Sequence, residues 1–118
     1  MEKVKIVIPE GVFDKWEELC EIGGQKIMVR SRISYADMVE FATEYAQHAC
    51  VIDNDAQIAY NAIEHQKIED YLVLKYYTNV DVDDHDDPFD YSANLKSLIE
   101  KKLGDYFYEN DANMSDAK

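Results

Sequence analysis

The sequence predicts an α+β fold in which a small N-terminal two-stranded β element packs on a bundle of three or four helices. Two observations predict this class. Apolar residues alternate near the N-terminus, as in strands, and recur at spacings of three and four through most of the remaining chain, as in helices. With 118 residues, of which 47% are hydrophobic, we expect a single compact acidic domain over 1–109 and a polar C-terminal tail over 110–118.

The N-terminal part of the chain is expected to supply both strands. In residues 3–9, valine and isoleucine alternate with lysine, which indicates a strand with one buried face that ends at Pro9. Residues 11–22 carry apolar side chains at helical spacing and predict a short helix, which the two following glycines end. Residues 25–30 then predict the second strand, which returns beside the first.

The clearest helical pattern lies in residues 34–49. Ser34 is a capping residue, and Asp37 three positions later completes a variant of the capping box. At about 100° per residue, apolar side chains gather in one sector and polar ones in nearly the opposite sector, as in a surface helix. The apolar sector contains Tyr35, Met38, Val39, Ala42, Tyr45, Ala46 and Ala49. The polar sector contains Asp37, Glu40, Glu44 and His48.

A third helix is expected after a turn at 51–54. Asp55 can cap this helix, and its apolar residues recur at helical spacing as far as Tyr76. The apolar register slips around His65 and Gln66. The pattern therefore leaves open whether one long helix bends there or two helices meet.

Residues 81–87 form an acidic stretch, with five carboxylates in seven residues. Such a run must be solvated or bound to something cationic, and we expect it to be a loop. Asp87 then supplies a helix cap, and Pro88 suits the first helical turn. The helix that follows is expected to end at Gly104.

The charge of the chain limits the kinds of partner that it can bind. Its 25 acidic and 12 basic residues give a net charge of -13, which argues against binding nucleic acid phosphates or an anionic membrane surface. Residues 33–66 contain six acidic residues and no lysine or arginine, and residues 81–90 contain six more, again without a base. This concentration favours a cationic partner surface, although an ordinary surface helix also presents acidic residues opposite its apolar stripe.

No catalytic or cofactor motif stands out in the sequence, so we expect neither enzymatic activity nor a cofactor nor a metal site. The alternating aspartates that begin at Asp81 are typical of the start of a calcium-binding loop. The match then fails, because His85, Asp86 and Ser92 stand where that motif requires other residues.

The two cysteines and the hydropathy pattern indicate the compartment. Cys20 and Cys50 have a spacing typical of neither a disulfide framework nor a zinc site, and both are expected to be buried, reduced thiols. The sequence has no signal-peptide core and no apolar run long enough to span a membrane. We therefore expect an intracellular, soluble protein.

Tyrosine is the dominant aromatic residue, with nine copies against four phenylalanines, and it is enriched at protein interfaces. Tyr71, Tyr76 and Phe107 are expected in the core. Other tyrosines and the clustered acids are the candidate partner-binding residues. These are Asp37, Glu40, Glu44, Tyr77, Asp81, Asp83, Asp84, Asp86, Asp87, Tyr91 and Tyr108.

The stretch DYLVLKYYTNVDV at 70–82, followed by the acidic loop and by PFDY at 88–91, resembles small uncharacterised proteins from the structural gene clusters of tailed bacteriophages. Residues 33–49 are also similar in placement, so the resemblance covers residues 33–91. It implies a non-enzymatic protein of virion assembly, at the head-tail connection or the tail, in the virion or the host cytoplasm. It implies protein partners and no site residues.

Two functions from different classes remain open. In the first, the chain is a phage structural or assembly protein, used in several copies, whose acidic and tyrosine-rich surfaces pack against basic surfaces of other proteins or of further copies. In the second, it is an inhibitor whose carboxylates imitate nucleic acid phosphates and occupy the basic groove of a nuclease or a host defence protein.

Overall fold

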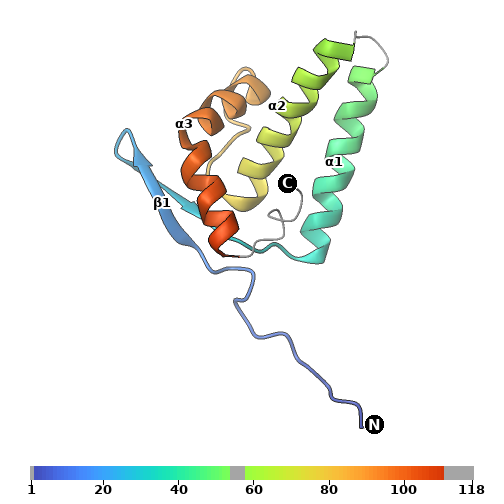
Figure 1. The fold of residues 1–118 in the computed structure, drawn as a ribbon, viewed down its shortest axis with the longest axis vertical. Helices are drawn as coiled ribbons and strands as arrows, with labels where there is room; N and C mark the ends of the chain where they lie inside the picture. Colours follow the sequence, from blue (N-terminus) through green and yellow to red (C-terminus); the bar gives the residue numbers. More distant parts are fainter. Residues whose placement is uncertain (1, 54–57, 111–118) are drawn as a thin grey trace.

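The computed structural model describes residues 2–53 and 58–110, in which a two-stranded antiparallel hairpin precedes three helices (Figure 1). The strands and helices are β1 (Glu17–Ile22), β2 (Gln25–Val29), α1 (Tyr35–Asp53), α2 (Ile58–Tyr77) and α3 (Pro88–Glu109). Helix α2 lies between α1 and α3, and β1 contacts α3. The predicted α+β class is therefore confirmed.

The hairpin is built around a two-residue turn at Gly23 and Gly24, whose φ angles are 58° and 80°. Positive φ at both central residues defines a type I′ turn, and this turn joins strands that begin directly on either side of it. Ile22 accordingly pairs with Gln25, and the register shifts once, between Glu18 and Cys20.

The first predicted strand and the predicted helix over 11–22 are therefore wrong. The glycine turn forces the residues just before it to pair with β2, and this constraint overrides the helical spacing of their few apolar side chains. Residues 3–9 are extended but unpaired, and they leave the body of the protein as an exposed arm (Figure 1). The predicted second strand is confirmed as β2.

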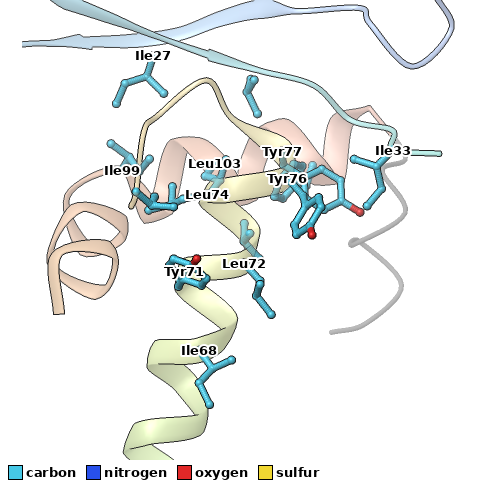
Figure 2. Close-up of a cluster of buried hydrophobic side chains, with 14 residues drawn as sticks. Ile27, Ile33, Ile68, Tyr71, Leu72, Leu74, Tyr76, Tyr77, Ile99 and Leu103 are labelled. Carbon is cyan, nitrogen blue, oxygen red and sulfur yellow. The ribbon is translucent and has the colours of Figure 1, made fainter. Parts of the chain in front are cut away.

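The hydrophobic core lies where the second half of α2 meets the hairpin and α3 (Figure 2). Leu72 and Leu74 of α2 are fully buried, and Val29 of β2 and Leu103 of α3 join them there. Burial of an aliphatic side chain of this size contributes about 1.5–3 kcal/mol, so these contacts stabilise the fold more than any surface pair. A two-stranded hairpin is only marginally stable by itself, and this one is stabilised because it packs against the core.

The aromatic residues divide between core and surface. Tyr71, Tyr76 and Phe107 are buried, as predicted. Tyr77 was expected at an interface, but its exposed fraction is 1% and its ring meets Phe107 edge-on at 5.3 Å. Because its side chain is buried where α2 meets α3, Tyr77 belongs to the core.

Residues directly after α2 bind the outer edge of β2. The backbone N–H of Arg30 donates to the carbonyl of Tyr77, and that of Asn79 donates to the carbonyl of Met28. The Asn79 side chain in turn accepts from the N–H of Met28, at 2.9 Å. This edge of the hairpin is therefore already occupied.

Some of the helix boundaries differ from the predicted ones, and others agree with them. Helix α1 continues through most of the expected turn at 51–54, and α2 is one helix through the position where the apolar register slips. Asp55, its expected cap, lies outside the described residues. Asp87 caps α3 as predicted, accepting from the N–H of Asp90 at 3.1 Å, and Pro88 follows in the first turn.

Gly104 does not end α3, which continues to Glu109. A glycine inside a helix costs about 1 kcal/mol relative to alanine. The burial of Leu103 and Phe107 on either side contributes more than that, because both side chains lie in the core. The predicted tail begins at this point, and residues 111–118 lie outside the described part of the chain.

The two cysteines are less buried than expected, since Cys20 is half-buried and Cys50 is exposed. Both are free thiols. Among the described residues, no helix combines the length and the apolar character needed to cross a membrane.

Candidate interaction surfaces

Helix α1 packs on α2 with a side that includes most of the residues that the sequence assigns to solvent. Ser34 caps the helix as predicted, accepting from the N–H of Asp37 at 3.1 Å. Along the helix, Asp37, Glu44 and His48 are partly buried, together with Phe41, whose ring lies 5.8 Å from that of Tyr76. The helix is thus rotated from its expected orientation, although Tyr45 and Ala49 of the predicted apolar sector stay partly buried and Glu40 stays exposed.

Glu44 explains much of this orientation. Its carboxylate accepts from the Lys75 ammonium at 2.8 Å and from the Tyr76 hydroxyl on the neighbouring α2. Burial alone would raise the pKa of Glu44, but the two donors outweigh it and hold the pKa below its ordinary value. The same contacts keep Lys75 charged, because pairing with Glu44 outweighs burial and raises the pKa of the ammonium.

Asp37 is held on the same side of α1 by Arg30, which follows β2. The guanidinium lies 3.6 Å from the Asp37 carboxylate and also donates to the carbonyls of Tyr76 and Phe13. Its flat face covers the Trp16 ring at 4.9 Å. Arg30 therefore connects three parts of the fold: the start of α1, the end of α2 and the segment before β1.

The consequence is an exposed apolar stripe on the opposite side of α1. Tyr35 is 77% exposed and Val39 is 46% exposed. Ala42 and Ala46 continue the same face, one and two turns further along the helix, and are also exposed. We call these four residues the α1 stripe.

An open groove of about 450 Å³ runs beside the α1 stripe, between α1 and α2. Val39 and Glu40 line it from α1, and Lys75 and Tyr76 line it from α2. Glu40 is exposed, so this predicted residue does lie on an accessible surface. An apolar stripe beside a groove with an acidic border is the shape that a partner helix can fill.

The acidic stretch at 81–87 forms a loop, as predicted. Most of its carboxylates accept hydrogen bonds from other groups of the same chain. Asp83 accepts from the Tyr71 hydroxyl at 2.6 Å, Asp81 accepts from the N–H of Asp83, and Asp87 caps α3. Burial and the contact with Asp83 raise the pKa of Tyr71 to about 12. Asp84 and Asp86 are exposed.

A second groove of about 600 Å³ lies between this loop and the tip of the hairpin. His85 stacks on the ring of Tyr91 at one side of it, with ring centroids 3.5 Å apart and an angle of 16°. Lys26 and Asp84 also line the groove, so both signs of charge face it. The stack fixes Tyr91 as a half-buried wall of this groove.

The predicted binding residues therefore do not form one surface. Glu40 borders the groove beside the α1 stripe, whereas Asp84, Asp86 and Tyr91 lie at the loop. Tyr108, 81% exposed, stands near the end of α3. Asp37 and Glu44 are partly buried in ion pairs, and Tyr77 is in the core. The other predicted acids, Asp81, Asp83 and Asp87, are exposed but accept hydrogen bonds within the chain.

The structure brings together few groups that could perform chemistry. In the part of the chain that the structure describes, no three histidine, cysteine or carboxylate side chains are placed to hold a metal ion. His48 packs against aromatic rings, edge-on to Phe89 at 5.0 Å and to Tyr71 at 6.3 Å. These contacts are those of a packed aromatic cluster.

Comparison with known proteins finds no matching family model, curated protein or solved structure.

Sequence reasoning missed the α1 stripe and the exposed arm at 3–9. For the stripe a signal does exist. Residues 33–66 have no lysine or arginine, and the nearby bases Arg30 and Lys75 lie outside that segment. Acidic side chains that have no basic neighbour on their own helix can pair with bases from other elements. For the arm, the alternating pattern predicts a paired strand, and nothing in the sequence signals that this segment is unpaired within the described part of the fold.

Proposed function

We propose that this chain is a non-enzymatic protein-protein interaction protein that forms part of a larger assembly, with the α1 stripe as a contact surface. The observation that carries the proposal is the orientation of α1. Four residues of its predicted apolar sector, the α1 stripe, are exposed to water, whereas Asp37 and Glu44 of the polar sector pair with bases of the neighbouring segments. Exposed apolar patches of this kind mark interaction sites.

The chemistry of the surface defines the partner. Tyr35 supplies a large flat apolar side chain, and the alanines of the stripe allow close approach of another backbone. Glu40 borders the adjoining groove and offers an exposed carboxylate. The matching partner presents an apolar helix face with a lysine or arginine at its edge, which agrees with the predicted preference for basic surfaces.

Virion assembly in a tailed bacteriophage, at the head-tail connection or in the tail, is the setting that we propose for this binding. The resemblance of residues 33–91 supports it. Proteins in such assemblies are used in several copies and are surrounded by neighbours, so an apolar stripe that is exposed in the isolated chain would be covered in the particle.

Imitation of nucleic acid is the less well supported alternative. It requires carboxylates on one continuous surface at about the spacing of backbone phosphates. Glu44 and Asp37 instead face Lys75 and Arg30 inside the bundle. In the loop, all five carboxylates are exposed, but Asp83 is bonded to Tyr71 and Asp87 caps α3.

Site-specific photo-crosslinking in the cells or particles that contain the chain tests the proposal. The photo-crosslinking residue benzoylphenylalanine replaces Tyr35 or Val39, one position at a time, in the stripe. In the control it replaces Lys101, which is exposed on α3. We expect an adduct of defined mass from both stripe positions and none from the control, because the stripe is covered by a partner and this part of α3 is not. Mass identification of the adduct then names the partner.

Absence of an adduct at both stripe positions, in a chain that folds normally and is present in the particle, would contradict the proposal. Partner binding that is lost when Asp84 and Asp86 are both changed to asparagine, and is unaffected by Val39→Asp, would favour the nucleic-acid-mimic alternative instead.

A further inference from the structure

We propose that the arm at 3–8 of one copy of this chain pairs as an added strand with the free edge of β1 in a second copy. The proposal rests on the proposed function, because it describes how copies of an assembly protein join to one another. It concerns a different surface from the α1 stripe, so the two can be tested separately.

The arm has the sequence of a strand and lacks a partner in its own fold. Val4, Ile6, Val7 and Ile8 are 79%, 81%, 85% and 65% exposed. Burying apolar area gains about 25 cal/mol per Å², so an alternating run of this kind has a strong tendency to pair. Six residues, 3–8, match the 6 residues of β1.

The arm is directed away from its own body. Arg30 holds the segment just before β1, through the carbonyl of Phe13 at 2.9 Å and the ring of Trp16 at 4.9 Å. A turn at Gly11, with φ of 77° and a hydrogen bond from Asp14 back to its carbonyl, separates that anchored segment from the arm. Figure 1 shows the arm extending from this turn into solvent.

The edge of β1 is the matching acceptor. Among the described residues, β1 pairs with β2 alone, while the outer edge of β2 is bound by the residues that follow α2. An open strand edge carries a row of backbone N–H and C=O groups that a second chain can bind. The hairpin has two strands, and a third makes such a sheet considerably more stable.

The charges of the two segments are complementary. The arm carries Lys3 and Lys5, whereas β1 carries exposed Glu17, Glu18 and Glu21. Opposite charges on adjacent strands stabilise pairing, while two β1 edges would repel each other because like charges would face one another. This difference favours arm-to-edge pairing over edge-to-edge pairing.

The mass of the purified full chain in solution, followed as its concentration rises, tests the proposal. We expect association of the unaltered chain, and a weakening of at least about tenfold in Ile6→Asp, because a carboxylate would be buried at an apolar strand position. Leu98→Asp is the matched control, since Leu98 is 74% exposed on α3, and this variant should associate like the unaltered chain.

Amide hydrogen exchange in the same samples locates the contact. Protection in β1 should rise with concentration in the unaltered chain and in Leu98→Asp, and should stay low in Ile6→Asp. Two results on the mass would overturn the proposal: an unaltered chain that remains monomeric at all concentrations, or an Ile6→Asp variant that associates normally. Protection of β1 without any change in mass would also overturn it, because that result indicates that the arm pairs with its own hairpin. Crosslinking from Val39 in the Ile6→Asp variant would show that the proposed function stands even so.

Discussion

Glu44 is the side chain on which the orientation of α1 depends most directly. Its two donors come from one turn of α2, and Lys75 also lies over the rings of Tyr71 and Tyr76, at 5.5 and 5.7 Å. The ion pair is partly shielded, with exposed side-chain fractions of 25% for Glu44 and 32% for Lys75. It is therefore stronger than a fully exposed pair, whose contribution is at most about 1 kcal/mol.

Glu44→Gln should lower the free energy of unfolding by about 1–2 kcal/mol at neutral pH, because Lys75 loses its charged partner. The folded-state pKa of Glu44 is below its ordinary value, so this contribution is present above the unfolded pKa of about 4.3 and disappears as the pH falls through the lower folded pKa. Urea denaturation at several pH values should show the two proteins converging below about pH 4.

Glu40→Gln is the control for this comparison. Glu40 is exposed on the same helix, and removing its charge should change the unfolding free energy by less than about 0.5 kcal/mol. A Glu44→Gln variant as stable as the unaltered chain at neutral pH, or a difference that persists unchanged into acid, would contradict the assigned role of Glu44.

The hairpin shows how a short sequence signal can determine a whole element. Gly23 and Gly24 both have positive φ, a conformation that most side chains adopt only at a cost of about 1–2 kcal/mol. The turn fixes the register of β1 on β2, and β1 in turn presents the edge that we propose for arm binding. The turn therefore controls both the stability of the hairpin and its capacity to bind.

Gly23→Val should destabilise the protein by about 1–2 kcal/mol, because a β-branched residue is strained at φ of 58°. Gly23→Asn should be nearly neutral, since asparagine followed by glycine is a preferred type I′ pair. Thermal unfolding of both variants measures the difference. Equal stability of the valine and asparagine variants would show that the turn does not have the assigned conformation.

The sequence predicted the elements that depend on local signals. Ser34 and Asp87 cap their helices as expected, β2 lies where the alternation predicts it, and the acidic stretch is a loop. Capping and turn residues act on neighbouring backbone groups, so their effect can be inferred without knowledge of the rest of the fold.

The orientation of α1 could not be predicted in the same way. Glu44 faces Lys75, 31 positions later, and Asp37 faces Arg30, which comes from another element. Periodicity identifies the two sides of a helix but not the side chains that each side will meet. For the same reason the sequence alone does not place Tyr77 in the core, because its contact with Phe107 joins α2 to α3.

Across the whole chain, the 25 acidic residues have two different roles. Asp37 and Glu44 pair with Arg30 and Lys75, whereas others are exposed, among them Glu40 and the carboxylates of the acidic loop. The two surfaces that we propose for binding, the α1 stripe and the arm, are mainly apolar, and the stripe is bordered by the acid Glu40. This arrangement fits a protein held in an assembly by apolar contacts, with charge selecting the partner.

The mass of the chain recovered from its source, measured in about 0.1 M and about 1 M salt, tests this account most directly. Raising the salt shortens the screening length from about 10 Å to about 3 Å, which weakens contacts between exposed charges and leaves apolar contacts intact. We predict a complex much larger than the 13.7 kDa chain at both salt concentrations. A 13.7 kDa monomer at both, or a complex that dissociates as the salt rises, would contradict the account.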